Sequence, residues 1–79
     1  MSYEWINPEK IGKKILGLRK EKNETSEQLA EALGISQSAI AMYETGKRIP
    51  RDEIKIRIAE HFGVSVESIF FPNEQHIAC

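Results

Sequence analysis

The stretch from Thr25 to Pro50, TSEQLAEALGISQSAIAMYETGKRIP, decides the fold. Thr25 and Gln28 have the spacing of a capping box, in which the threonine hydroxyl accepts from the N–H three residues on and the glutamine reaches back. This spacing predicts a helix from Ser26 to Leu33. Gly34 supplies the left-handed backbone with which many helices end. We therefore expect a sharp helix stop at this glycine.

A second short helix follows at once. Ser36 can cap a helix over Gln37 to about Glu44, and Gly46 ends it by the same backbone argument. Ala30 and Gly34 are small where the two helices would approach and the chain turns. The positions that two crossing helices would bury against each other are apolar: Leu29, Leu33, Ile35, Ile40 and Tyr43. The pattern predicts two helices that meet at a steep angle through a turn of about three or four residues.

The sequence before this pair predicts another helix. Asn7 can cap it, and Pro8 fits the first helical position, where its missing N–H costs nothing. Gly12 and Gly17 should weaken this helix slightly. Its apolar residues recur at helical spacing: Ile11, Ile15 and Leu18.

Two further helices are expected after the basic loop 47–50. The run Ile54 to Ile58 alternates like a strand, but the spacing of Ile54, Ile58 and Phe62 favours a helix, which Gly63 would end and which leaves Ile56 pointing away. Asp52 and Glu53 suit the positive end of that helix. A last short helix would be capped by Ser65, contain Val66 and Ile69, and end at Pro72.

These elements describe an all-α fold, a compact five-helix domain with a helix-turn-helix. A chain of 79 residues has room for one such domain, expected over residues 8–71. Residues 1–7 would form an N-terminal extension, and residues 72–79 a tail without periodicity that we expect to be disordered.

Composition excludes several classes of protein. Cys79 is the only cysteine and has no neighbouring zinc-type ligands, and no apolar run approaches the ~20 residues of a membrane span. No nucleophile elbow or phosphate-binding glycine loop is present. His61 and His76 lack partners at metal spacing, and we expect His61 on a solvated helix face. We expect a cytoplasmic protein that is not an enzyme and needs no metal, cofactor or small-molecule ligand.

The chain resembles the Xre-type, lambda-repressor-like helix-turn-helix family. The resemblance is carried by the segments Leu18–Arg19, Thr25–Ala30, Leu33–Ser36 and Tyr43–Pro50, and it covers nearly everything from Ile11 to Phe70. It implies a five-helix DNA-binding domain, usually a dimer on a two-fold symmetric operator. In such a domain the third helix, here about 37–44, enters the major groove N-terminus first.

The resemblance implies roles for residues on that third helix. Gln37 can bond adenine bidentately, and Ser38 can donate to or accept from several bases. Ala41 and Met42 offer apolar contacts to a thymine methyl group. The alternative is that all four side chains are merely exposed helix residues.

Phosphate contacts are expected from the ends of the two helices. Ser26 lies at the start of the earlier helix, where N–H groups and the helix dipole attract phosphate. The family often has glutamine there, so the backbone N–H is the firmer contact. Thr45, Lys47, Arg48 and Arg51 come just past the recognition helix and can reach flanking phosphates. The lysines of the first helix are expected to supply only long-range attraction. The net charge of −1 argues against a protein that coats nucleic acid by bulk attraction alone.

Other residues are expected to serve architecture and assembly. The resemblance suggests that Arg19 and Glu44 form an ion pair that ties the first helix to the third. The adjacent aromatics Phe70 and Phe71 cannot both face one core from a short helix, so with Ile56 they are candidates for a dimer surface.

Two functions are compatible with these observations. A domain of this length leaves no space for an effector-binding domain, so we expect a transcriptional repressor that occupies a palindromic operator in double-stranded DNA as a homodimer. The alternative is a protein-interaction module on the same fold, such as the antitoxin of a toxin–antitoxin pair, because fold does not guarantee function.

Overall fold

Five helices follow one another in the computed structural model, which describes residues 7–70. They are α1 (Pro8–Glu21), α2 (Ser26–Leu33), α3 (Gln37–Glu44), α4 (Asp52–Phe62) and α5 (Val66–Phe70). No strand occurs within residues 7–70. The predicted tail 72–79, Phe71 and nearly all of the predicted extension 1–7 lie outside the described residues. The predicted all-α, five-helix fold is confirmed.

Side-chain caps start the first three helices where the sequence predicts. The Asn7 side-chain oxygen accepts from the N–H groups of Glu9 and Lys10 at 2.9 and 3.1 Å. Both bonds of the predicted capping box form, because the Thr25 hydroxyl accepts from the Gln28 N–H at 3.0 Å and the Gln28 side chain accepts from the Thr25 N–H at 2.9 Å. These caps fix where each helix begins.

Glycines in left-handed backbone end α2 and α4. Gly34 has φ +73° and Gly63 has φ +69°, values that L side chains rarely adopt. Gly46 follows the end of α3 with φ +81°. The two helices of the helix-turn-helix are therefore separated by a short turn, which Ser36 closes by accepting from the Ala39 N–H at 3.1 Å.

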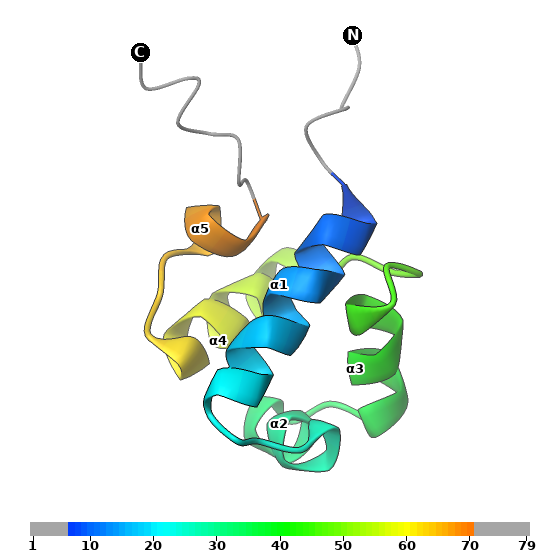
Figure 1. Ribbon diagram of the computed structural model, residues 1–79, viewed down its shortest axis with the longest axis vertical. Helices are drawn as coiled ribbons and strands as arrows, with labels where there is room; N and C mark the ends of the chain where they lie inside the picture. The colour runs from blue at the N-terminus through cyan, green and yellow to red at the C-terminus, as the bar shows by residue number, and fades with distance from the viewer. Residues whose placement is uncertain (1–6, 71–79) are drawn as a thin grey trace, which may run out of the picture.

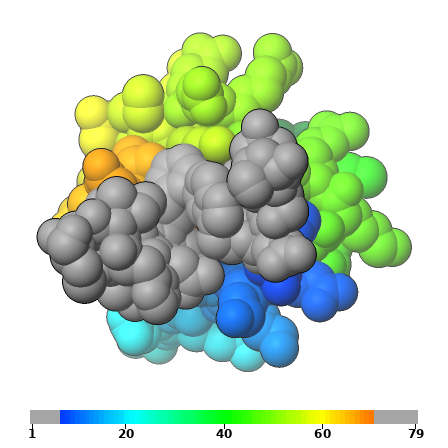
Figure 2. Space-filling view, turned by 90° about the horizontal axis from the view of Figure 1, so that it is seen from above, coloured from blue at the N-terminus to red at the C-terminus, as the bar shows by residue number. Residues whose placement is uncertain are grey.

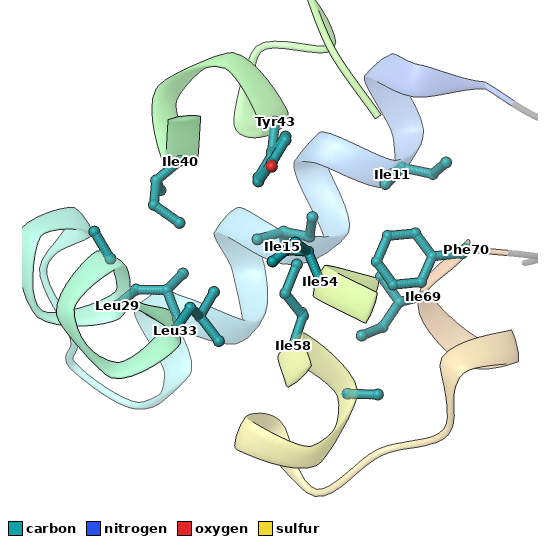
Figure 3. Close-up of a cluster of buried hydrophobic side chains, with 12 residues drawn as sticks. Ile11, Ile15, Leu29, Leu33, Ile40, Tyr43, Ile54, Ile58, Ile69 and Phe70 are labelled. Carbon is teal, nitrogen blue, oxygen red and sulfur yellow. The ribbon is translucent and has the colours of Figure 1, made fainter. Parts of the chain in front are cut away.

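The core lies where the five helices meet (Figure 3). Leu29 of α2 and Ile40 of α3 are fully buried and pack in one cluster, so the two helices of the pair are locked together. Ile54 and Ile58 are also buried while Ile56 is 51% exposed, so the helical interpretation of this segment is right. The remaining buried apolar residues come from all five helices: Ile11, Ile15, Ala30, Leu33, Tyr43, Ala59, Ile69 and Phe70.

Helix α1 crosses α3 at Gly12. A Cβ at this position would collide with the backbone carbonyl oxygens of Tyr43 and Glu44. Gly12 was expected only to weaken α1, but it is what allows the two backbones to touch. Gly17, by contrast, has no atom within 4 Å of the place where a Cβ would stand.

The two views agree on how α3 and α5 are arranged. Helix α3 and helix α5 lie on opposite sides of the molecule, with α1 between them in Figure 1 (Figures 1 and 2). Helix α1 packs against both of them. Within residues 7–70, no helix is both long enough and apolar enough to cross a bilayer.

Candidate nucleic-acid interface

Helix α3 has one side that is buried in the core and one side that is exposed. Ile40 and Tyr43 are buried, with 0% and 6% of their surface exposed. The four residues predicted to read bases are all exposed: Gln37, Ser38, Ala41 and Met42. Met42 is 38% exposed, which is uncommon for a large apolar side chain in this domain. The exposed stripe is therefore held on a helix whose other side is anchored in the core.

The N-terminus of α2 lies beside the start of α3. The Gln37 amide nitrogen donates a hydrogen bond of 2.9 Å to the hydroxyl oxygen of Ser26. A glutamine side chain has two N–H donors and one carbonyl acceptor, so this bond leaves two groups for another partner. The bond orients Gln37 before any ligand arrives. Sequence reasoning did not find it, although the tight turn between the two helices predicts that their first residues are neighbours.

A basic segment continues the exposed face beyond α3. The N–H groups of Lys47 and Arg48 both donate to the carbonyl oxygen of Met42, at 2.9 and 3.3 Å, so the chain folds back over the end of the helix. The Thr45 hydroxyl donates to the carbonyl oxygen of Ala41 at 2.8 Å. Lys47, Arg48 and Arg51 are exposed, and none of them is paired with a carboxylate within residues 7–70. Their positive charges are available to an anionic partner.

Arg19 ties the C-terminal end of α3 to α1. Its Nε and Nη2 atoms donate to the two carboxylate oxygens of Glu44 at 2.7 and 3.0 Å, and its Nη1 atom donates to the carbonyl oxygen of Glu24 at 2.8 Å. The two side chains of the pair are 14% and 10% exposed. The hydrogen bond to Glu44 raises the pKa of Arg19 above its ordinary value, so the guanidinium stays charged. The pair is part-buried and joins α1 to α3.

Phe70 corrects one expectation. It was assigned to a dimer surface because two adjacent aromatics cannot both face one core, but it is only 1% exposed. Helix α5 packs against both α1 and α4, so the neighbouring side chains of Ile69 and Phe70 are both enclosed. Phe71 lies outside the described residues. Of the three residues predicted to form this surface, Ile56 is the one that the structure exposes.

His61 corrects a second expectation. It was predicted on a solvated helix face, but its Nε2 atom lies 2.8 and 3.0 Å from the two carboxylate oxygens of Glu24. Only 19% of the His61 side chain and 14% of the Glu24 side chain are exposed. The sequence separation of 37 residues hides this pair from any local pattern. Within residues 7–70, no group of three or more metal-binding side chains is assembled.

The chain is similar to known helix-turn-helix proteins. The helix-turn-helix family model HTH_3 matches residues 15–69. The chain is 44% identical over 48 residues, which are 61% of this chain and 73% of the relative, to an uncharacterized HTH-type transcriptional regulator from Methanocaldococcus jannaschii.

The names of two similar proteins state whether they activate or repress transcription. The chain is 38% identical over 64 residues, 81% of this chain and 31% of the relative, to the HTH-type transcriptional activator BcrR from Enterococcus faecalis. It is 32% identical over 60 residues, 76% of this chain and 54% of the relative, to the cryptic phage CTXphi transcriptional repressor RstR from Vibrio cholerae. The chain thus spans less than two thirds of these two relatives.

A solved structure shares the fold. The clp gene regulator ClgR from C. glutamicum superposes with a TM-score of 0.72 at 25% sequence identity, over 81% of this chain and 83% of that one. The arrangement of five helices described above is therefore one that a known gene regulator adopts.

Proposed function

The chain belongs to the HTH_3 helix-turn-helix family, and on this premise we propose that it represses transcription by binding a palindromic operator in double-stranded DNA as a homodimer. DNA-binding regulation of transcription is the function of the family. The finer assignment depends on one observation, the exposed stripe of Gln37, Ser38, Ala41 and Met42 on a helix anchored by Ile40 and Tyr43.

Base reading would come from α3 in the major groove. Gln37 keeps an N–H donor and a carbonyl acceptor beyond its bond to Ser26, the combination that pairs with the N7 and N6 groups of adenine. Ser38 can donate or accept. Ala41 and Met42 would contact thymine methyl groups.

Phosphate contacts would fix the register of α3 in the groove. At one side, the first turn of α2 would present N–H groups and the Ser26 hydroxyl to the phosphates of one DNA strand. At the other side, Thr45, Lys47, Arg48 and Arg51 would face the flanking phosphates. These contacts carry no sequence information, so specificity depends on α3.

Dimerisation would place two recognition helices on successive turns of one DNA face, about 34 Å apart. Ile56 marks the proposed contact, because it is 51% exposed on α4 and the buried residues of that helix face the other way. Repression follows if the dimer covers a promoter, which needs no further activity. The protein would work in the cytoplasm, together with its DNA.

The test is selection of genomic DNA fragments by the purified chain, followed by titration of the recovered site at several salt concentrations. Specific binding with a steep fall of log affinity against log salt would support the proposal, because phosphate neutralisation releases counterions. The variants Gln37→Ala and Ser38→Ala should lose sequence preference but retain weak binding. Unchanged preference in both variants would refute base reading by α3. Failure to recover DNA, with tight and salt-insensitive pairing to a protein, would favour the antitoxin alternative.

A further inference from the structure

Helix α4 is joined to both ends of α2 by polar contacts that the DNA-reading face does not use. Beyond one end, His61 contacts the carboxylate of Glu24, two residues before α2 starts. A carboxylate only accepts hydrogen bonds, so the ring nitrogen is the donor. At the other end, the Nη1 atom of Arg57 donates to the carbonyl oxygen of Leu33, the last residue of α2, at 3.1 Å. We call Arg57 and His61 the α4 clamp.

The clamp lies at the solvent-exposed edge of the contact between α2 and α4, whose buried residues belong to the common core cluster. An open depression at this edge is lined by Ala32, Leu33, Arg57, Glu60 and His61. Arg57 and His61 are four residues apart and therefore share one side of α4. Two attachments at opposite ends of α2, which is eight residues long, oppose both sliding and rotation of α2 relative to α4.

The clamp therefore connects α4, which carries the proposed dimer contact, to the helix pair that carries the proposed DNA-reading face. In a dimer on DNA these two surfaces must be held at a fixed angle. Helix α4 carries the exposed Ile56, directly beside Arg57. Helix α2 is fixed to α3 by the buried contact of Leu29 and Ile40 and by the hydrogen bond between Ser26 and Gln37. A change in the orientation of α2 would therefore move α3 as well. The orientation of α2 on α4 thus determines how far apart two recognition helices stand when two copies meet at α4.

We propose that Arg57 and His61 are positioning residues that set the half-site spacing selected by the dimer, without contact to DNA. This inference rests on the proposed function, and on dimerisation through Ile56 in particular. Loss of the clamp should leave each α3 able to read its own half-site. It should weaken the discrimination between operators whose half-sites are separated by different numbers of base pairs.

The experiment uses the full chain and a series of symmetric duplexes that carry the selected half-site at centre-to-centre separations increased in single base-pair steps. The clamp variant is Arg57→Met with His61→Leu, which removes both donors but keeps apolar bulk. The repaired variant is Arg57→Lys with His61→Gln, which restores a donor at each position. Glu60→Gln is the matched control, because Glu60 lies in the same depression and makes no side-chain hydrogen bond or ion pair within residues 7–70.

The wild-type chain and the Glu60→Gln control should prefer one separation. The clamp variant should lose that preference by about fivefold or more, as expected for two lost charge-assisted bonds, and the repaired variant should regain it. Affinity for a duplex with one half-site should change little. An unchanged spacing profile in the clamp variant would overturn the inference, and so would an equal loss on one half-site and on two. A wild-type chain that binds DNA without any spacing preference would instead refute the proposed dimer, and this inference with it.

Discussion

The amide nitrogen of Gln37 lies 2.9 Å from the hydroxyl oxygen of Ser26, eleven residues earlier. The bond joins the first residue of α3 to the first residue of α2. A proposed base-reading side chain is thus held by a proposed phosphate-binding residue. Ordering Gln37 in advance reduces the side-chain entropy lost when DNA binds.

The first prediction concerns this pair. Gln37→Ala should reduce specific DNA affinity by about 1–3 kcal/mol, the discrimination that a good bidentate base contact provides. Ser26→Ala should cost less, and the double variant should lose less than the sum of the two, because each single change already breaks the shared bond. Binding titrations of the four proteins on the selected site measure the coupling. Strict additivity would show that the bond has no part in recognition.

The second prediction contrasts two glycines of α1. Gly12→Ala should destabilise the domain by about 1–3 kcal/mol or more, since its Cβ meets the rigid backbone carbonyls of Tyr43 and Glu44. Gly17→Ala, on the same helix but in open space, should stabilise the domain by up to about 1 kcal/mol. Urea unfolding followed by circular dichroism gives both values. Equal effects of the two substitutions would contradict the close approach of α1 and α3.

The third prediction concerns the ion pair of Arg19 and Glu44. Arg19→Met should cost about 2–4 kcal/mol of unfolding free energy, because it leaves the poorly exposed Glu44 carboxylate without its partner. Changing both residues to apolar ones should cost less than Arg19→Met alone. Thermal unfolding of the single and double variants tests this. If the double variant were the least stable, the penalty of an unpaired charge would not be the cause.

The fourth prediction concerns the basic segment after α3. Lys47→Ala or Arg48→Ala should lower affinity for all DNA sequences alike and reduce the slope of log affinity against log salt by about 1 each. Lys14→Ala, on the exposed side of α1, is the control and should reduce the slope less. Fluorescence anisotropy at several salt concentrations gives the slopes. A change in sequence preference would show that these residues contact bases.

The fifth prediction separates assembly from folding. Ile56→Asp should shift the chain toward monomer in light scattering, and its unfolding midpoint should stay close to that of the wild type at protein concentrations where both are monomeric, because Ile56 is 51% exposed in the single chain. Phe70→Ala should instead destabilise the fold by about 3–5 kcal/mol, as expected for a buried aromatic side chain. A monomeric wild-type chain at high concentration would refute the assembly role of Ile56.

Features with local causes were predicted from the sequence. Caps such as Asn7, Thr25 and Ser36 act over two or three residues, and the left-handed glycines act at their own position, so the helix boundaries could be read directly. The exposed stripe on α3 follows from helical periodicity in the same way.

Several features that depend on contacts between distant segments were missed, whereas the ion pair of Arg19 and Glu44 was expected from the family resemblance. Gly12 looked like a weakness of α1, because its meaning depends on the backbone of α3. Phe70 was placed outside, because a short helix enclosed by two neighbours is not visible in its own sequence. His61 and Glu24 are 37 residues apart, and no periodicity joins them.

The exposed and the buried side chains of α3 are different residues, which has a practical consequence for changing the DNA sequence that the protein recognises. Gln37, Ser38, Ala41 and Met42 are all exposed, so exchanging them should alter folding stability by no more than about 0.5 kcal/mol each. On the proposed base reading, a library that exchanges these four residues for others that helices tolerate should yield regulators with new operators on the same scaffold. On the same proposal, the residues of α3 that select the operator differ from Ile40 and Tyr43, which anchor the helix in the core.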